Sequence, residues 1–390
     1  VLGQELCAGS SNWHFKGARF CDYDINHLDN VKELISTYGG VSMSYYAASG
    51  YEYRTFFNKG DDIAYYFPYK AAANHAVELI GWDDDYSASN FKKTPAGNGA
   101  WLMKNSWGTN FGDNNGTTGS GYFWISYYDK SICDIIAVDY DNKDTYANMY
   151  AYDGGNMVNL NANKGTTFLN IYEAKAYGEG SVEKIDGVMT YLAANMPFSV
   201  TVYSNPVVES GKLVGYSGKS EALSGCSDYE GFYTIDLKSR NIYVPDGMTY
   251  GICIETERDK ATSAGGSSIG SGGYYQDHGQ TYTGYSLDSL SDNADSPYNK
   301  VGAPCIRGLT NKASGITLST SITLDKHSIT LAEADSKKLT ANVLPAGTTN
   351  KTYGFRSTDN SVAEVDANGN VTAAGYGECD IIVTSYDGMS

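Results

Sequence analysis

The sequence predicts an α+β region followed by two all-β sandwich domains. Three observations lead to this prediction. One segment near the start has helical periodicity, several strand-like segments follow it, and beyond residue 138 the chain consists of short strands separated by turn signals. The chain has 390 residues, too many for one ordinary domain. We expect domain boundaries at residues 1–138, 139–312 and 316–390.

The helical segment is DINHLDNVKELISTYGG, residues 24–40. Its apolar residues recur with a period near 3.6, and Gly39 with Gly40 supplies the signal that ends a helix. The predicted apolar stripe consists of Ile25, Leu28, Val31, Leu34 and Ile35.

Four segments after the helix are predicted to be strands, and polar loops separate them. One helix that leads into several antiparallel strands is typical of an α+β fold. The segments are VSMSYYA at 41–47, HAVELIGWD at 75–83, GAWLMKNSW at 99–107 and GYFWISYYD at 121–129.

The second and third regions are predicted to be all-β. Residues 139–312 contain short apolar runs such as FSVTVYS and TYGICIETE without helical periodicity, which favours a β-sandwich. Residues 316–390 alternate polar and apolar side chains and carry an Asn-Gly turn, which favours a small sandwich. This last region is expected to stop before its final strand is complete.

The charge of the chain excludes two classes of partner. Its formal charge is −17, and such an acidic chain repels nucleic acid and anionic lipid. No apolar run approaches the length of a transmembrane helix. The acidic runs Asp61-Asp62 and Asp83–Asp85 lack the spacing of a calcium loop, so we interpret them as solvated charges and expect no metal and no cofactor.

The seven cysteines show no zinc spacing. Proximity in the sequence allows the pairs Cys7–Cys21 and Cys226–Cys253. Buried free thiols are an equally good interpretation of the same residues.

His75 and Asn105 stand at the edges of two predicted strands, in NHAVELIGW and WLMKNSWG. A histidine at the start of a strand has a fixed ring with one edge open, which suits a general base. A buried asparagine is costly unless its amide is paired, and its oxygen can accept from an imidazole N–H. The pair therefore has the chemistry of a base and its orienter, as in Cys-His-Asn triads. A core histidine bonded to a backbone carbonyl is the alternative.

The chain contains the motifs NHAV, KNSWG and GYFWIS in this order. With these motifs, about residues 25–130 resemble the C-terminal half of papain-like cysteine proteases. The resemblance implies that His75 is the catalytic base, Asn105 orients it, and Trp107 shields their hydrogen bond. It also implies that Ala76 and Val41 help wall the pocket for a substrate side chain. The backbone around Asn74 would bind the peptide.

The nucleophile of such a protease is expected on a long helix upstream, with a glutamine shortly before it. Cys7 follows Gln4, but the residues after Cys7 are turn-like, and only 68 residues separate it from His75. The family spacing is about 130 residues. We therefore expect the cysteine to be supplied by an upstream segment or chain, and this chain alone to be inactive. Because the chain begins at Val1 without an initiator Met, we expect that a preceding part was cut off or lies outside this sequence.

The other two regions resemble known bacterial domains. GFYTIDL, GMTYGICIE and APCIRGLT resemble a lectin-like β-sandwich, and DNSVAEVDANGNVTA resembles a group 2 bacterial immunoglobulin-like domain. Together the resemblances imply a secreted or cell-surface bacterial cysteine endopeptidase that acts on peptides or proteins. The tyrosines of residues 271–290 could stack on a cell-wall glycan, although packing is the simpler interpretation. The rival hypothesis is a surface adhesin or structural protein with an inactive protease-like domain.

Overall fold

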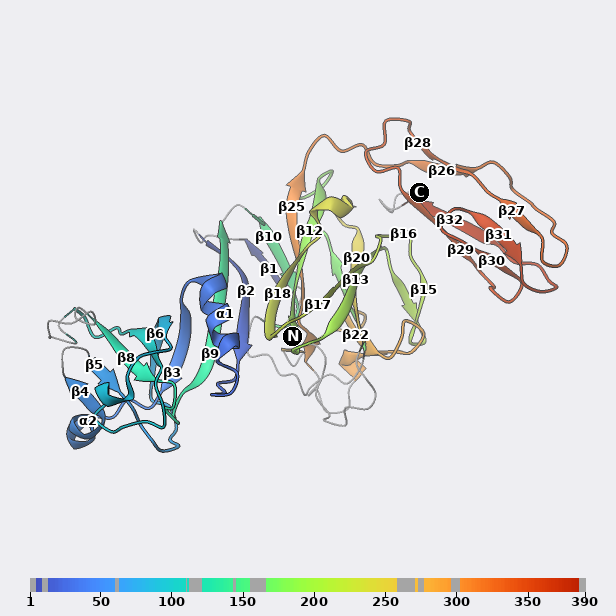
Figure 1. Ribbon diagram of the computed structural model, residues 1–390. Helices are drawn as coiled ribbons and strands as arrows, with labels where there is room; N and C mark the ends of the chain where they lie inside the picture. The colour runs from blue at the N-terminus through green and yellow to red at the C-terminus, as the bar shows by residue number, and fades with distance from the viewer. Residues whose placement is uncertain are drawn as a thin grey trace. The chain divides into compact units, whose positions relative to one another are not determined.

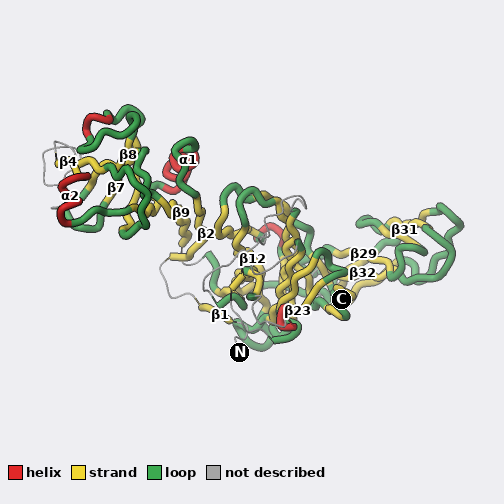
Figure 2. Tube along the Cα trace, turned by 90° about the horizontal axis from the view of Figure 1, so that it is seen from below, coloured by secondary structure: helices red, strands yellow, loops and turns green. Residues whose placement is uncertain are grey.

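The computed structural model divides the chain into two compact units (Figure 1). The smaller unit consists of residues 15–140 and 229–231, and the larger unit of residues 1–14, 141–228 and 232–390. Strands dominate the regular structure, as Figure 2 shows. The predicted fold class, α+β followed by all-β sandwiches, is confirmed, while the exact domain boundaries stay a prediction. The structure describes residues 5–8, 13–59, 63–109, 111, 121–142, 145–154, 166–257, 271–272, 277–295 and 302–385.

The smaller unit is built on one sheet. Its strand order is β2-β9-β3-β6-β7-β8-β5-β4. Adjacent strands from β9 to β8 are antiparallel, and β5 joins β8 in parallel. The strands are β2 (Trp13–Cys21), β3 (Val41–Tyr45), β4 (Phe57–Lys59), β5 (Ile63–Tyr65), β6 (His75–Asp83), β7 (Ala100–Lys104), β8 (Tyr122–Ser126) and β9 (Cys133–Asn142).

Helix α1 (Leu28–Tyr38) packs one face onto this sheet. Val31, Leu34 and Ile35 are buried, and the N–H of Gly39 closes the helix on the carbonyl of Ile35. The prediction that Ile25 belongs to the apolar stripe is wrong. Ile25 precedes the helix and is 37% exposed, because the turn that begins at Asp24 delays the helix until Leu28.

A second helix, α2 (Gly50–Phe56), was not predicted. Its seven residues are too few to show a period, so only the tertiary structure reveals it. Phe56 at its end is buried in the same core as the sheet. The largest buried side chains of this core include Trp101, Tyr45, Tyr65, Phe123 and Met43.

Buried Asp129 ties together three loops of the smaller unit. One carboxylate oxygen accepts the N–H of Phe67 at 2.7 Å, and the other accepts both the N–H and the hydroxyl of Ser131. The hydroxyl oxygen of Ser131 in turn accepts the N–H of Tyr46 at 3.1 Å. Burial raises the pKa of Asp129 to about 6 against these hydrogen bonds, which lower it.

The larger unit contains a β-sandwich with a core between two sheets. One sheet has the order β1-β10-β25-β12-β18 with β19 beside β12, and the other β16-β13-β20-β11-β22-β23 with β17 beside β13. Tyr150, Tyr172 and Tyr250 lie fully buried in this core. The strands of the first sheet are β1 (Glu5–Ala8), β10 (Asn148–Ala151), β12 (Val182–Leu192), β18 (Glu230–Asp236), β19 (Ile242–Pro245) and β25 (Ile306–Ala313). Those of the second are β11 (Thr167–Glu173), β13 (Pro197–Ser204), β16 (Gly218–Lys219), β17 (Leu223–Cys226), β20 (Thr249–Thr256), β22 (Thr281–Gly284) and β23 (Leu290–Asp292).

Small sheets form the C-terminal part of the chain, around a core that contains Leu339 and Val371. The predicted incomplete last strand concerns residues 386–390, which lie outside the described residues, as do Asp61 and Asp62. The strands are β26 (Ser321–Leu324) with β28 (Ala341–Leu344), β27 (Ser336–Lys338) with β31 (Asn370–Ala373) and β30 (Ala363–Val365), and β29 (Tyr353–Ser357) with β32 (Ile381–Ser385).

Two expectations from the sequence concern disulfides and membrane-spanning helices. Cys21, Cys226 and Cys253 are free, so neither of the candidate disulfides forms. Within the described ranges, no helix is both long and apolar enough to cross a membrane.

The raised pKa of Asp129 predicts a pH dependence of stability. Between about pH 4 and 6 the folded state binds the Asp129 proton more tightly than the unfolded chain does, and this stabilisation is lost as the pH rises through 6. Asp129→Asn removes it. The unfolding free energy of the wild type relative to the variant is therefore expected to fall by up to about 3 kcal/mol from pH 4 to 7.

Urea unfolding followed by tryptophan fluorescence measures this difference, since Trp82, Trp101, Trp107 and Trp124 all lie in the smaller unit. Asp134→Asn, at an exposed position nearby, is the matched control. A difference between wild type and Asp129→Asn that does not change with pH would contradict the prediction.

Candidate active site

The sheet of the smaller unit brings His75 and Asn105 together. His75 begins β6 opposite Tyr45 of β3, and Asn105 directly follows β7, the other neighbour of β6. The Nε2 atom of His75 lies 2.9 Å from the Oδ1 atom of Asn105. An amide oxygen only accepts, so Nε2 carries the hydrogen and Nδ1 is the nitrogen with a free lone pair. The ring therefore has the tautomer that a general base requires at Nδ1.

Asn105 is held in place by its neighbours. It is 9% exposed, its N–H donates to the carbonyl of Gly121, and its Oδ1 also accepts the N–H of Ser106 at 2.8 Å. This second donor fixes which end of the amide faces His75. The Nδ2 atom is buried with no hydrogen-bond partner among the described residues. An unpaired buried amide costs about 1–3 kcal/mol, a cost typical of residues kept for function.

Aromatic rings hold the imidazole. The ring of Trp107 stacks on His75 with centroids 4.6 Å apart and planes at 19°, and Phe111 meets Trp107 edge-on. Tyr45 meets the imidazole edge-on at 5.8 Å. Trp107 is 48% exposed, so it covers one face of the imidazole while its own outer face meets solvent. That Trp107 shields the His75–Asn105 hydrogen bond from water stays a prediction.

The side chain of Asn74 is engaged with the backbone. Its Oδ1 accepts the N–H of Ala47 at 2.7 Å, and its Nδ2 donates to the carbonyl of the same residue. Its own N–H donates to the carbonyl of Tyr45. These bonds fix the approach of the chain to His75. That the backbone around Asn74 binds a peptide stays a prediction.

A groove of about 600 Å³ adjoins Asn105 and includes Ala76 and Val41. Ala76 is exposed, whereas Val41 is 1% exposed and belongs mainly to the core. The lining also contains residues of β9 that were not anticipated, although alternation in CDIIAVDYD is a usable signal. They are Ile136, Val138 and Tyr140.

One ion pair lies at the groove and was also missed. Glu78 of β6 and Lys104 of β7 are opposite each other in register, with Nζ 3.1 Å from the carboxylate. The hydrogen bond to Glu78 raises the pKa of Lys104. The pair adds polarity without net charge to a lining that is otherwise largely apolar.

The described thiols of the smaller unit are not activated. Burial, followed by the charge of Asp22, raises the pKa of Cys21. Burial and the hydrogen bond to Asp134 raise that of Cys133 to about 11. A nucleophilic thiol needs a lowered pKa. Cys7 lies on β1, whose backbone pairs with β10 in the larger unit.

Three family descriptions match separate parts of the chain. Residues 7–141 match the papain family cysteine proteases, residues 149–287 a lectin-like domain, and residues 319–390 the bacterial Ig-like domain of group 2. A curated relative, an uncharacterized protein of Clostridium acetobutylicum, is 36% identical over 74 residues. That match covers 19% of this chain and 19% of the relative's length.

Two solved structures are similar over most of the chain. The clostridial cysteine protease Cwp84 after propeptide cleavage has a TM-score of 0.56 and 25% identity, covering 77% of this chain and 71% of that one. The cysteine protease and lectin-like domains of Cwp84, a surface layer associated protein of Clostridium difficile, give 0.54 and 23%, covering 78% and 64%. Residues 7–141 therefore belong to the papain family of cysteine proteases, and a lectin-like domain and a bacterial group 2 immunoglobulin-like domain follow them.

Proposed function

We propose that this protein is a secreted or cell-surface bacterial cysteine endopeptidase in which His75 is the general base and Asn105 its orienter. The observation that carries the proposal is the 2.9 Å contact from His75 Nε2 to Asn105 Oδ1 beneath the stacked ring of Trp107. Similarity to Cwp84, described as a surface layer associated protein, supports the location. Substrates are peptides or proteins.

In the proposed mechanism the thiol comes from a segment upstream of this chain. Nδ1 of His75 takes the thiol proton, and the resulting imidazolium lowers the pKa of the thiol from its usual value near 8.5. The thiolate attacks the peptide carbonyl, and the imidazolium then protonates the leaving amine. Asn105 keeps the ring in place through both transfers without adding a second negative charge beside the thiolate.

The groove beside Asn105 receives a substrate side chain in this proposal. Ala76 leaves its mouth open because it has only a methyl group, and Val138 and Ile136 supply apolar walls. The Glu78–Lys104 pair offers a donor and an acceptor to a longer side chain. The lining suits an apolar side chain of moderate length better than a charged one, because burying an unpaired charge is costly.

Asn105→Ala tests the orienting role. Without the amide the ring loses its fixed tautomer, so kcat is expected to fall by about 100-fold with little change in KM, at the lower end of the range that general acid–base catalysis contributes. His75→Ala is expected to abolish peptide hydrolysis. The measurement is hydrolysis of a fluorogenic peptide by the protein with its upstream segment.

His327→Ala, on the immunoglobulin-like domain, is the matched control and should retain full activity. Unchanged kcat in Asn105→Ala with its fold intact by circular dichroism would remove the assigned role.

A thiol-directed peptide electrophile tests the origin of the nucleophile. Applied to native material, it is expected to label a cysteine upstream of Val1, and Cys7→Ser is expected to label as fully as the wild type. Peptide mapping by mass spectrometry locates the label. Label on Cys7 would overturn the assignment, and a Ser or Gly at the upstream position would favour the inactive adhesin or structural protein.

Ala76→Leu tests the groove. The larger side chain is expected to lower kcat/KM at least tenfold for peptides with a bulky apolar residue in the groove, while a glycine or alanine residue there is processed normally. Ala72→Leu makes the same change at an exposed position outside the groove lining and should have no effect. Equal losses for large and small side chains would show that Ala76 does not wall the pocket.

A further inference from the structure

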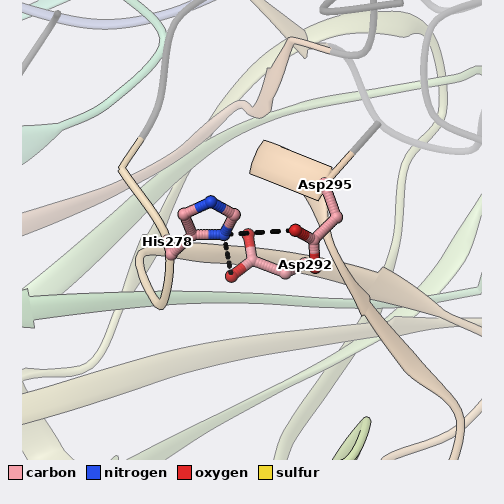
Figure 3. A group of neighbouring side chains, drawn as sticks. All are labelled: His278, Asp292 and Asp295. Carbon is pink, nitrogen blue, oxygen red and sulfur yellow. Dashed lines mark ion pairs between the residues drawn. The ribbon is translucent and has the colours of Figure 1, made fainter. Parts of the chain in front are cut away.

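Three groups with metal-binding atoms converge beside the hairpin of β22 and β23, at one edge of the second sheet of the larger unit. His278 precedes β22, Asp292 ends β23, and Asp295 lies in the 3₁₀ turn η3 (Asn293–Asp295) that follows. One ring nitrogen of His278 faces the carboxylates of both aspartates (Figure 3). Their ligand atoms all lie within 4.8 Å of one another.

The separations do not fit an ordinary hydrogen bond. Nδ1 of His278 lies 3.6 Å from Asp292 and 3.3 Å from Asp295, while N–H···O bonds are usually about 2.7–3.2 Å long. Two ligands bound to Zn²⁺ at about 2.0–2.1 Å in a tetrahedron lie roughly 3.3 Å apart. The distance from Nδ1 of His278 to each carboxylate is therefore close to the distance between two ligands of one tetrahedral ion.

Asp292 is oriented before any ion binds. Its side chain is 14% exposed, its Oδ1 accepts the N–H of Ala294 at 2.9 Å, and its Oδ2 accepts the N–H of Gly279 at 2.7 Å. Each carboxylate oxygen keeps a second lone pair for a metal. Bonds of this kind, from outer groups to a ligand, hold metal ligands in a fixed direction.

The segments that carry the ligands are anchored to the sandwich. The carbonyl of Gln280 accepts the N–H of Ile171 in β11, and Tyr282 pairs with Asp292 across β22 and β23. Buried Asn293 donates to the hydroxyl of Thr281, which ties η3 to β22. The backbone around His278 and Asp292 therefore keeps these ligands near one another without help from a metal.

The local charge favours a cation. The two carboxylates sum to −2, and within the described ranges the only basic side chain that pairs with either of them is His278. The imidazole selects the class of ion, because nitrogen ligands suit zinc and its neighbours, whereas calcium takes oxygen ligands. This cluster stands against the expectation from the sequence that the chain holds no metal.

We propose that His278, Asp292 and Asp295 bind a divalent transition-metal ion of the zinc class, with water in the remaining position. The ion would link the turn before β22 to η3. The proposal is independent of the protease mechanism, because all three ligands belong to the larger unit.

Zinc titration by calorimetry tests the site on the whole chain. The wild type is expected to bind one Zn²⁺ more than His278→Ala, or to bind it at least tenfold more tightly, and Asp295→Asn is expected to show the same loss. Both positions are well exposed, so these variants should fold normally. Free thiols and His75 can also take up zinc, and the comparison between variants removes their contribution.

His327→Ala is the matched control and should bind like the wild type. Absence of saturable zinc binding in the wild type, or equal binding by wild type, His278→Ala and Asp295→Asn, overturns the proposal. Calcium that competes with zinc at equal concentration for the ligand-dependent site overturns the assignment to the zinc class.

Discussion

The hydrogen bond between His75 and Asn105 depends on one strand pairing, that of β6 with β7. The pairing sets Glu78 opposite Lys104, and Asn105 follows one residue later, where the chain leaves the sheet toward the base. A slip of one residue would turn Asn105 to the opposite face and leave its amide without the imidazole. The register is secured because Met103 and Leu79 face each other and are both completely buried. The relative position of His75 and Asn105 therefore depends on packing in the core of the smaller unit.

The same pairing is kept across a long connection. Residues 84–99 connect β6 to β7, yet the strands remain paired out to Asp83 and Ala100. The loop buries Tyr86 and Phe91 against Tyr66 in a small core of its own. Because the connection carries its own apolar side chains, it forms a local cluster beside the sheet. The loop length therefore leaves the relation between His75 and Asn105 unchanged.

How much of the structure the sequence predicts depends on how far apart in the sequence the contacting residues lie. Predicted segments such as HAVELIGWD correspond to strands because alternation is a local signal. Ile25 was misplaced, since the helix start is decided by a turn at Asp24. The β9 residues of the groove, such as Val138, could not be placed, because no local pattern says that β9 lies beside β3. His278 and Asp292 are brought together by the hairpin of β22 and β23, whose register was not predicted from the sequence.

The cysteines of this chain show why a thiol from elsewhere fits the site. Burial raises the pKa of the Cys21 and Cys133 thiols, and the neighbouring carboxylates of Asp22 and Asp134 raise it further. A papain-type nucleophile needs the reverse, a positive partner and no nearby carboxylate. In the proposed mechanism His75 offers that partner through Nδ1, and Asn105 orients it without adding charge. If the smaller unit acts as proposed, a thiol placed at Nδ1 would meet the conditions that Cys21 and Cys133 lack.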